Sequence, residues 1–200
     1  MALSLYLRYV FVLQRHYKKY NTILGKMAKE KVIMSIDPAE KTGWAIYKNG
    51  KIIKHGTKRF TKSTCGKYMN WLLQMIGEHE VTHIAAEAIF REATHKKDKA
   101  FWALAAMQGV LCAIAENNKL DLTFIDPREA KETTIPNLWL KLRKCTNEKE
   151  RRTECKRLMV SRVKFLGYQL ENDKADDEAD AIGILITYLH NNGIPVKHPK

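Results

Sequence analysis

The chain has 200 residues, 45% of them hydrophobic, which suits one compact domain with a sizeable core. Its 35 Lys and Arg against 22 Asp and Glu give a formal net charge of +13, which favours a polyanionic partner, nucleic acid first and a membrane surface second. Its four cysteines form no CxxC pair and no metal-like spacing with histidine, which argues against a secreted disulfide scaffold and predicts reduced thiols.

The N-terminal residues 1–26 contain five basic residues and no acid. Their apolar stretch, MALSLYLRYVFVL, is too short and too interrupted by Arg8 to span a bilayer, and it lacks the features of a signal peptide. We interpret residues 1–30 as a dispensable basic extension, with a basic amphipathic helix as the alternative and Met27 as an alternative start. We predict a main domain over 31–192, a tail over 193–200, and a cytoplasmic protein of a bacterium or virus that is neither secreted nor bound to a membrane.

The first part of the main domain is rich in strand signals. KVIMSID (31–37) is a short apolar run that ends at Asp-Pro, as expected of a buried strand. Residues 42–60 predict two more strands joined at Asn49-Gly50, a strong hairpin signal. Apolar residues at helical spacing predict a helix over 64–79, and VTHIAAEAIF (81–90) predicts a fourth, buried strand.

The second part of the domain is mainly helical. The Ala-rich run 99–118 predicts a long helix, and LDLTFID (120–126) predicts a fifth strand. Asp126 and Pro127 are typical of the start of a helix, a basic helix is expected over 148–167, and an acidic start marks a last helix over 176–191. This order predicts an α/β fold in which a mixed five-stranded sheet, a three-strand antiparallel meander plus parallel strands, is flanked by helices.

Four carboxylates interrupt segments that are otherwise apolar. Asp37 ends the first strand, Glu87 lies in the fourth, and Asp177 and Asp180 are three residues apart, hence on one face of the last helix. If the first and fourth strands are neighbours, Asp37 and Glu87 meet in the crevice at the strands' carboxyl ends, and the last helix can add its two acids. Taken singly, each acid is equally well a turn residue, a paired buried acid or a helix-dipole partner. Together they repel one another unless a cation holds them, and hard oxygen ligands suit Mg²⁺ or Mn²⁺.

These motifs resemble those of the RuvC-like Holliday junction resolvases of the RNase H-like superfamily. IMSIDPAEKTGWAI is similar to the family's first-strand motif, with Ala39 in place of the usual Gly, and AAEAIF to its second acidic motif. AMQGVLCAIA resembles the following helix motif without its Arg, and DDEADAIGI resembles the closing Asp-x-x-Asp motif. The resemblance spans residues 31–190 and implies an RNase H-like fold and a homodimeric crossover junction endodeoxyribonuclease that leaves a 5′-phosphate and a 3′-hydroxyl.

The resemblance also implies roles for particular residues. Asp37, Glu87, Asp177 and Asp180 would be the catalytic residues and would bind two Mg²⁺ ions, for which Mn²⁺ can substitute. Asp176 is the alternative ligand, but the Ala-Asp-Ala pattern at 179–181 favours Asp177. The residues expected to bind DNA are Phe90, Arg91, Lys96, Lys97, Lys131, Lys149, Arg151 and Arg152.

These DNA-binding assignments also have structural alternatives. Phe90 would stack on bases, or else be a core residue at a strand end. The basic run 141–164, with ten Lys or Arg against three Glu, would follow phosphate backbones, or else be a solvated helix face. We expect recognition of branched shape, as in a four-way junction, rather than strict sequence. The expected dimer surface is the Ala-rich helix over 103–113.

Three other functions are compatible with the sequence. The same metal chemistry would serve an RNase H-like nuclease that acts on RNA or on flaps and forks. A non-catalytic nucleic-acid-binding protein could keep the same fold, although the presence of all four acids argues against it. A protein bound to a membrane surface through residues 1–26 is a weaker alternative.

Overall fold

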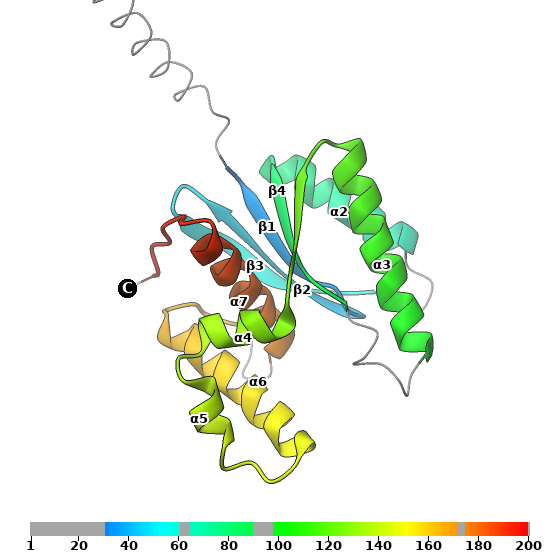
Figure 1. Cartoon of the computed structure of the whole chain (residues 1–200). Coiled ribbons are helices and arrows are strands. Elements are labelled where there is room, and N and C mark those ends of the chain that lie inside the picture. The colour runs from blue at the N-terminus through cyan, green and yellow to red at the C-terminus, as the bar shows by residue number, and fades with distance from the viewer. Residues whose placement is uncertain (1–30, 61–64, 90–97, 172–174, 200) are drawn as a thin grey trace, which may run out of the picture. The chain divides into compact units, whose positions relative to one another are not determined.

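The structure is a computed structural model that describes residues 31–60, 65–89, 98–171 and 175–199. Five strands form one sheet in the order β3-β2-β1-β4-β5 (Figure 1). β1, β2 and β3 form an antiparallel meander, while β4 and β5 run parallel to β1. This arrangement confirms the predicted α/β fold with a mixed five-stranded sheet. The strands are β1 (Ile33–Asp37), β2 (Lys41–Lys48), β3 (Lys51–Arg59), β4 (His83–Glu87) and β5 (Asp121–Ile125).

The turn between β2 and β3 has the conformation that its sequence predicts. Asn49 and Gly50 have φ angles of 55° and 80°, both in the left-handed region. Two such residues in succession give a turn whose twist matches that of the two strands, and Asn-Gly is the pair that adopts it most readily. The hairpin therefore fixes the register of β2 against β3.

Six helices lie in the described ranges and cover both faces of the sheet (Figure 1). Because side chains alternate along a strand, Met34, Ile36 and Ile84 form one core with α2 and α3. Ile33 and Ala85 point to the opposite face and form a second core with α4, α6 and α7. The helices are α2 (Cys65–His79), α3 (Asp98–Asn117), α4 (Pro127–Thr134), α5 (Leu138–Leu142), α6 (Glu148–Phe165) and α7 (Asp176–Asn191).

Some boundaries differ from the sequence prediction for identifiable reasons. β4 ends at Glu87 rather than at residue 90, because β5, its outer partner, ends at Ile125, which pairs with Glu87. α6 ends two residues early, ahead of Gly167, which has a left-handed φ of 92°. α5 was not predicted, because five residues are too few for a helical period to show.

Two further expectations concern redox state and membranes. All four cysteines have free thiols. In the part of the chain that the structure describes, no helix has the length and apolar character needed to cross a membrane. The domain boundaries near residues 30 and 192 stay predictions.

Candidate metal-binding and catalytic site

Asp37 and Glu87 lie side by side at the carboxyl edge of the sheet. β1 and β4 are parallel neighbours, with Ile36 paired to Ala86, so the next residues of the two strands are Asp37 and Glu87. The alternation that sends Ile33 and Ala85 to the α7 face sends these two acids to the same face. The neighbouring strands required by the sequence argument are therefore present.

α7 packs directly on β1 and β2 because the residues at the contact are small. Gly43 pairs with Asp37, and a Cβ atom at Gly43 would lie only 1.8 Å from the carbonyl oxygen of Asp177. Ala181 is fully buried, and its carbonyl oxygen accepts a hydrogen bond from Ser35 Oγ at 2.7 Å. The first turn of α7, which holds the acids, is thereby placed against the end of β1.

Glu178 is an acid of α7 with a structural role. Its side chain is 1% exposed and accepts hydrogen bonds from His55 Nδ1 at 2.6 Å and from the backbone N–H of Glu171 at 3.0 Å. These bonds tie the start of α7 to β3 and to the segment before the helix. The acidic sequence at 176–180 therefore combines one structural carboxylate with the candidate ligands around it.

Three of the candidate ligands, Asp37, Glu87 and Asp180, have raised pKa values. Burial raises the pKa of Asp37 well above its usual range, and the negative charges of Glu87, Asp180 and Asp177 raise it further, against the opposing charge of Lys131. Burial also raises the pKa of Glu87 to about 7 and that of Asp180 to about 6, again opposed by Lys131. Acids from β1, β4 and α7 thus form one electrostatic group, with the Lys131 ammonium of α4 beside it.

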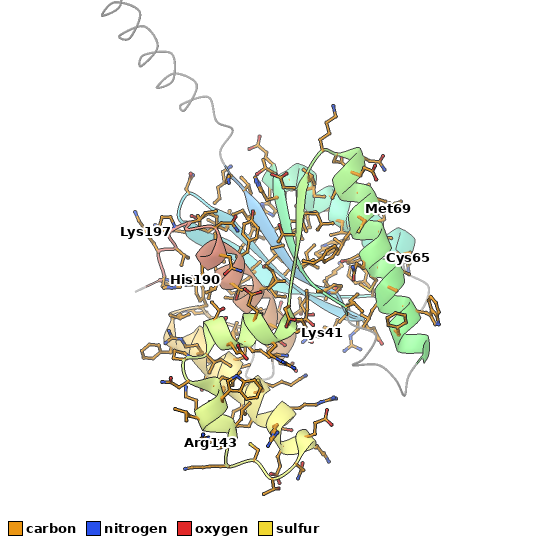
Figure 2. All side chains as sticks on the ribbon, viewed as in Figure 1. Lys41, Cys65, Met69, Arg143, His190 and Lys197 are labelled. Atoms are coloured by element: carbon orange, nitrogen blue, oxygen red, sulfur yellow. The ribbon has the colours of Figure 1, made fainter. Side chains whose placement is uncertain are left out.

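Asp176 and Asp177 have different partners. Asp177 Oδ2 lies 3.3 Å from Lys41 Nζ, at the start of β2, which Figure 2 labels at this end of the sheet. Asp176 pairs with Lys156 of α6, and although burial raises the pKa of Asp176, this bond leaves it below its usual value. Asp177 but not Asp176 is among the charges that raise the pKa of Asp37, whereas both of them raise the pKa of Asp180. This placement favours Asp177 as the candidate ligand.

Several residues near the site were not anticipated. Lys41 and Lys156 look like ordinary surface lysines in the sequence, and nothing local marks them as partners of the acids. Asp126 was expected only as a helix cap, and its carboxylate does accept hydrogen bonds from the N–H groups of Arg128 and Glu129. Its charge also raises the pKa of Glu87, because β5 ends beside β4.

The predicted DNA-binding residues divide into three groups. Lys131 lies among the candidate ligands. Lys149, Arg151 and Arg152 are exposed in the first half of α6. The other four lie outside the described residues: Phe90, Arg91, Lys96 and Lys97.

The donor chemistry of the acids fits a divalent cation. Carboxylate oxygens are the hard ligands that Mg²⁺ prefers, and bound cations would relieve the repulsion that raises the pKa values of the group. Across residues 31–60, 65–89, 98–171 and 175–199, no three His, Cys, Asp or Glu side chains are arranged to hold one ion. In this arrangement the positive charge beside the acids comes from Lys41, Lys131 and Lys156.

The raised pKa of Glu87 predicts a pH effect on stability. A carboxyl with a pKa of 4.5 in the unfolded chain and about 7 in the fold stabilises the protein below pH 4.5, and this contribution is lost as pH rises to about 7. In EDTA, the free energy of unfolding of the wild type minus that of Glu87→Gln should therefore fall between pH 4.5 and 7.5. Urea unfolding at several pH values measures this difference, from which histidine contributions common to both proteins cancel. A difference in unfolding free energy that does not change with pH would contradict the raised pKa of Glu87.

Comparison with known proteins supports the fold. No family model matches the sequence, and no curated relative is found. The structure is similar to Thermus thermophilus RuvC in complex with a Holliday junction, with a TM-score of 0.59 and 14% identity over 82% of this chain and 96% of that one. The yeast mitochondrial Holliday junction resolvase Ydc2 gives a TM-score of 0.52 at 13% identity, covering 80% of this chain and 78% of that one. Fowlpox virus resolvase, solved with Holliday junction DNA, gives 0.51 at 12% identity, covering 80% and 98%. The chain therefore has a RuvC-like fold of the RNase H-like type.

Proposed function

We propose that this protein is a structure-selective DNA endonuclease that resolves Holliday junctions or other branched DNA by metal-dependent phosphodiester hydrolysis. The observation that supports this most is the group formed by Asp37, Glu87 and Asp180, which three separate elements bring to one edge of the sheet. The net charge of +13 suits a polyanionic substrate. The similar solved structures are Holliday junction resolvases, two of them with junction DNA bound.

The four acids and Lys131 would have different roles in the cleavage reaction. Asp37, Glu87, Asp177 and Asp180 would hold two Mg²⁺ ions, which, when bound, supply activation of water and stabilisation of the leaving 3′ oxygen. Lys131 is proposed to contact the phosphate that is cut, and its position close enough to lower the pKa values of Asp37, Glu87 and Asp180 supports this role. Because the pKa of Glu87 is raised to about 7, metal binding near neutral pH would displace protons from the group. The products would be a 5′-phosphate and a 3′-hydroxyl.

The basic surface of α5 and α6 would bind the phosphate backbone. It contains a depression of about 600 Å³, with Lys141, Lys144 and Lys149 among its lining residues. Two acids also line it, but Glu150 accepts hydrogen bonds from Thr146, and Glu154 pairs with an arginine of the same helix. Lys149, Arg151 and Arg152 are proposed to contact phosphates here. We include Phe90, Arg91, Lys96 and Lys97 in the proposal from the sequence resemblance alone.

The outer face of α3 is the proposed dimer surface. Trp102 is 68% exposed, and the exposed residues that follow it, Ala103, Ala106 and Ala113, are small and apolar. Small side chains let two helices approach closely, and exposed apolar faces of this kind commonly mark interfaces. A twofold dimer would place one candidate site on each of two equivalent strands of a junction.

A substrate panel tests the activity. Labelled four-way junctions, forks, flaps, linear duplex and RNA–DNA hybrids are incubated with the protein and Mg²⁺, Mn²⁺ or EDTA. The proposal expects cleavage of branched DNA that needs the metal, with little cleavage of linear duplex. Faster cleavage of the hybrid would indicate an RNase H-like nuclease that acts on RNA. Tight binding without any cleavage would indicate a nucleic-acid-binding protein with this fold.

The same experiment tests the dimer when the substrate is a plasmid with an extruded cruciform. Two sites acting within one encounter cut both strands and give linear DNA directly. A single site gives nicked circles, which lose the cruciform on relaxation and are not cut again. Linear product at limiting enzyme therefore supports the dimer, and nicked circles alone contradict it.

A further inference from the structure

A second basic depression lies at the edge of the sheet where the end of β3 meets α2, the helix on the opposite face of the sheet from α7. Figure 2 labels Cys65 and Met69, which mark this helix. The depression has a volume of about 380 Å³, within the range of pockets that bind small ligands. Phe60 forms part of its wall, and its other lining residues are Lys58, Arg59, Lys67, Asn70, Trp71 and Gln74.

This depression is close to the candidate catalytic site along the same edge of the sheet. Asp37 pairs with Gly43 on β2, and two residues further along that edge Lys41 pairs with Arg59 on β3. With about 4.8 Å between strands and about 3.3 Å per residue, Arg59 lies on the order of 10 Å from Asp37. A strand of nucleic acid that leaves the carboxylates past β2 therefore reaches the depression within about two nucleotides.

The charges of the depression are available to a ligand. None of its lining residues is acidic. Arg59 has an acidic neighbour, Glu40, but their atoms are 3.9 Å apart and both side chains are about two-thirds exposed, so this pair contributes little. Lys58 and Lys67 are exposed. A phosphate group would thus meet three cations without first displacing a buried ion pair.

An aromatic ring and two amides complete the lining. The indole of Trp71 is partly exposed and is held by Phe60 and Tyr68, with ring centroids 5.4 and 6.0 Å away. A ring fixed in this way offers a face on which a base can stack without ordering a mobile side chain. Asn70 adds a hydrogen-bond donor and acceptor for a base or a sugar, and Gln74, whose Nε2 already donates to Glu78 Oε1 at 2.7 Å, adds its amide oxygen as an acceptor.

We propose that the β3–α2 depression binds a nucleotide of the DNA strand that leaves the catalytic edge, with its phosphate on Lys58, Arg59 and Lys67 and its base on Trp71. The proposal rests on the proposed function for the direction of the strand. It adds a contact surface on the face of the sheet opposite to α5 and α6. Branched DNA would thereby be held on both sides of the site, which a linear duplex cannot satisfy at once. An acidic peptide would use the cations but would leave the aromatic face and amides without a role.

The test neutralises the three cations and compares the result with an equal loss of charge elsewhere. The test variant is Lys58→Gln/Arg59→Gln/Lys67→Gln, and the matched control, Lys51→Gln/Lys54→Gln/Lys119→Gln, changes exposed lysines at the other end of the sheet. Binding of a labelled four-way junction is measured by fluorescence anisotropy in EDTA over a range of salt. The test variant should bind about tenfold more weakly than the control, with a salt slope smaller by about 2.

A second measurement locates the base. A junction with 5-iodouracil two nucleotides from the branch should crosslink to Trp71 under ultraviolet light, and the crosslink should disappear in the cation variant. Equal affinity and equal salt slope for the two triple variants would overturn the inference. It would also be overturned if the cation variant lost binding of polyglutamate, used as an acidic peptide, but bound the junction as tightly as the control. Neither outcome alters Mg²⁺-dependent cleavage by the wild type, so failure of this inference is distinct from failure of the proposed function.

Discussion

Asp37→Asn is expected to abolish Mg²⁺-dependent cleavage of branched DNA while leaving DNA binding intact or stronger. The substitution removes one negative charge from the edge that would face the scissile phosphate, so the repulsion between protein and DNA falls. It also replaces one of the four candidate metal ligands by a weaker one. Loss of residues that only orient metal ligands lowers activity by about 10- to 100-fold, so loss of a ligand should exceed about 100-fold. Initial cleavage rates and anisotropy titrations on the same junction measure the two effects separately.

The same variant should be more stable than the wild type when metal is absent. Burial and three neighbouring carboxylates raise the pKa of Asp37, which means that its charged form is disfavoured in the fold. Removing that charge should raise the free energy of unfolding at pH 8 in EDTA. Glu116→Gln, an exposed acid of α3, is the matched control and should change neither cleavage nor stability. Parallel loss of cleavage, binding and stability in Asp37→Asn would instead mean that Asp37 is a structural residue.

The sheet could be predicted because its signals are local. Asn49-Gly50 determines the hairpin, and the apolar runs of β1 and β4 each end in one acid. Helix-length segments between β4 and β5 indicate a parallel crossover, which places the carboxyl ends of the strands together. These features predict that Asp37 and Glu87 meet at one edge if β1 and β4 are neighbours, and the strand order of the sheet shows that they are.

The remainder of the site depends on packing between distant segments. Glu178 and Asp177 are adjacent acids in the sequence, yet Glu178 pairs with His55 and Asp177 with Lys41, on two different strands. Which acid faces which strand depends on the rotation of α7 on the sheet. That rotation is determined by contacts such as the one at Gly43, which a single sequence does not reveal. The depression beside β3 likewise arises only when α2 packs on the sheet.

Gly43→Ala is expected to lower both the stability and the activity of the protein. A Cβ atom at this position would lie 1.8 Å from the carbonyl oxygen of Asp177 and 2.5 Å from its carbonyl carbon. Backbone atoms cannot move aside as the end of a flexible side chain can. α7 must therefore shift away from β2, at a cost of about 3 kcal/mol of unfolding free energy or more. Urea denaturation measures this loss.

Gly77→Ala separates this close approach from the general effect of replacing glycine. Gly77 lies in α2 with nothing within 4 Å of the position of a Cβ, so alanine there should stabilise the protein by about 0.5–1 kcal/mol through helix propensity. Its cleavage rate should match that of the wild type. Equal stability of the two variants would mean that α7 does not rest on β2 as described.

Activity gives the sharper test of Gly43, because the shift moves the candidate ligands of α7 away from those of the sheet. Asp177 and Asp180 would retreat together, while Asp37 and Glu87 stay on their strands. The Mg²⁺ concentration needed for half-maximal cleavage should then rise by about tenfold in Gly43→Ala under conditions where the variant is still folded. A variant that is only less stable would instead show a lower maximal cleavage rate with an unchanged Mg²⁺ requirement. A variant that loses stability but keeps the wild-type Mg²⁺ requirement would show that α7 supplies no metal ligand.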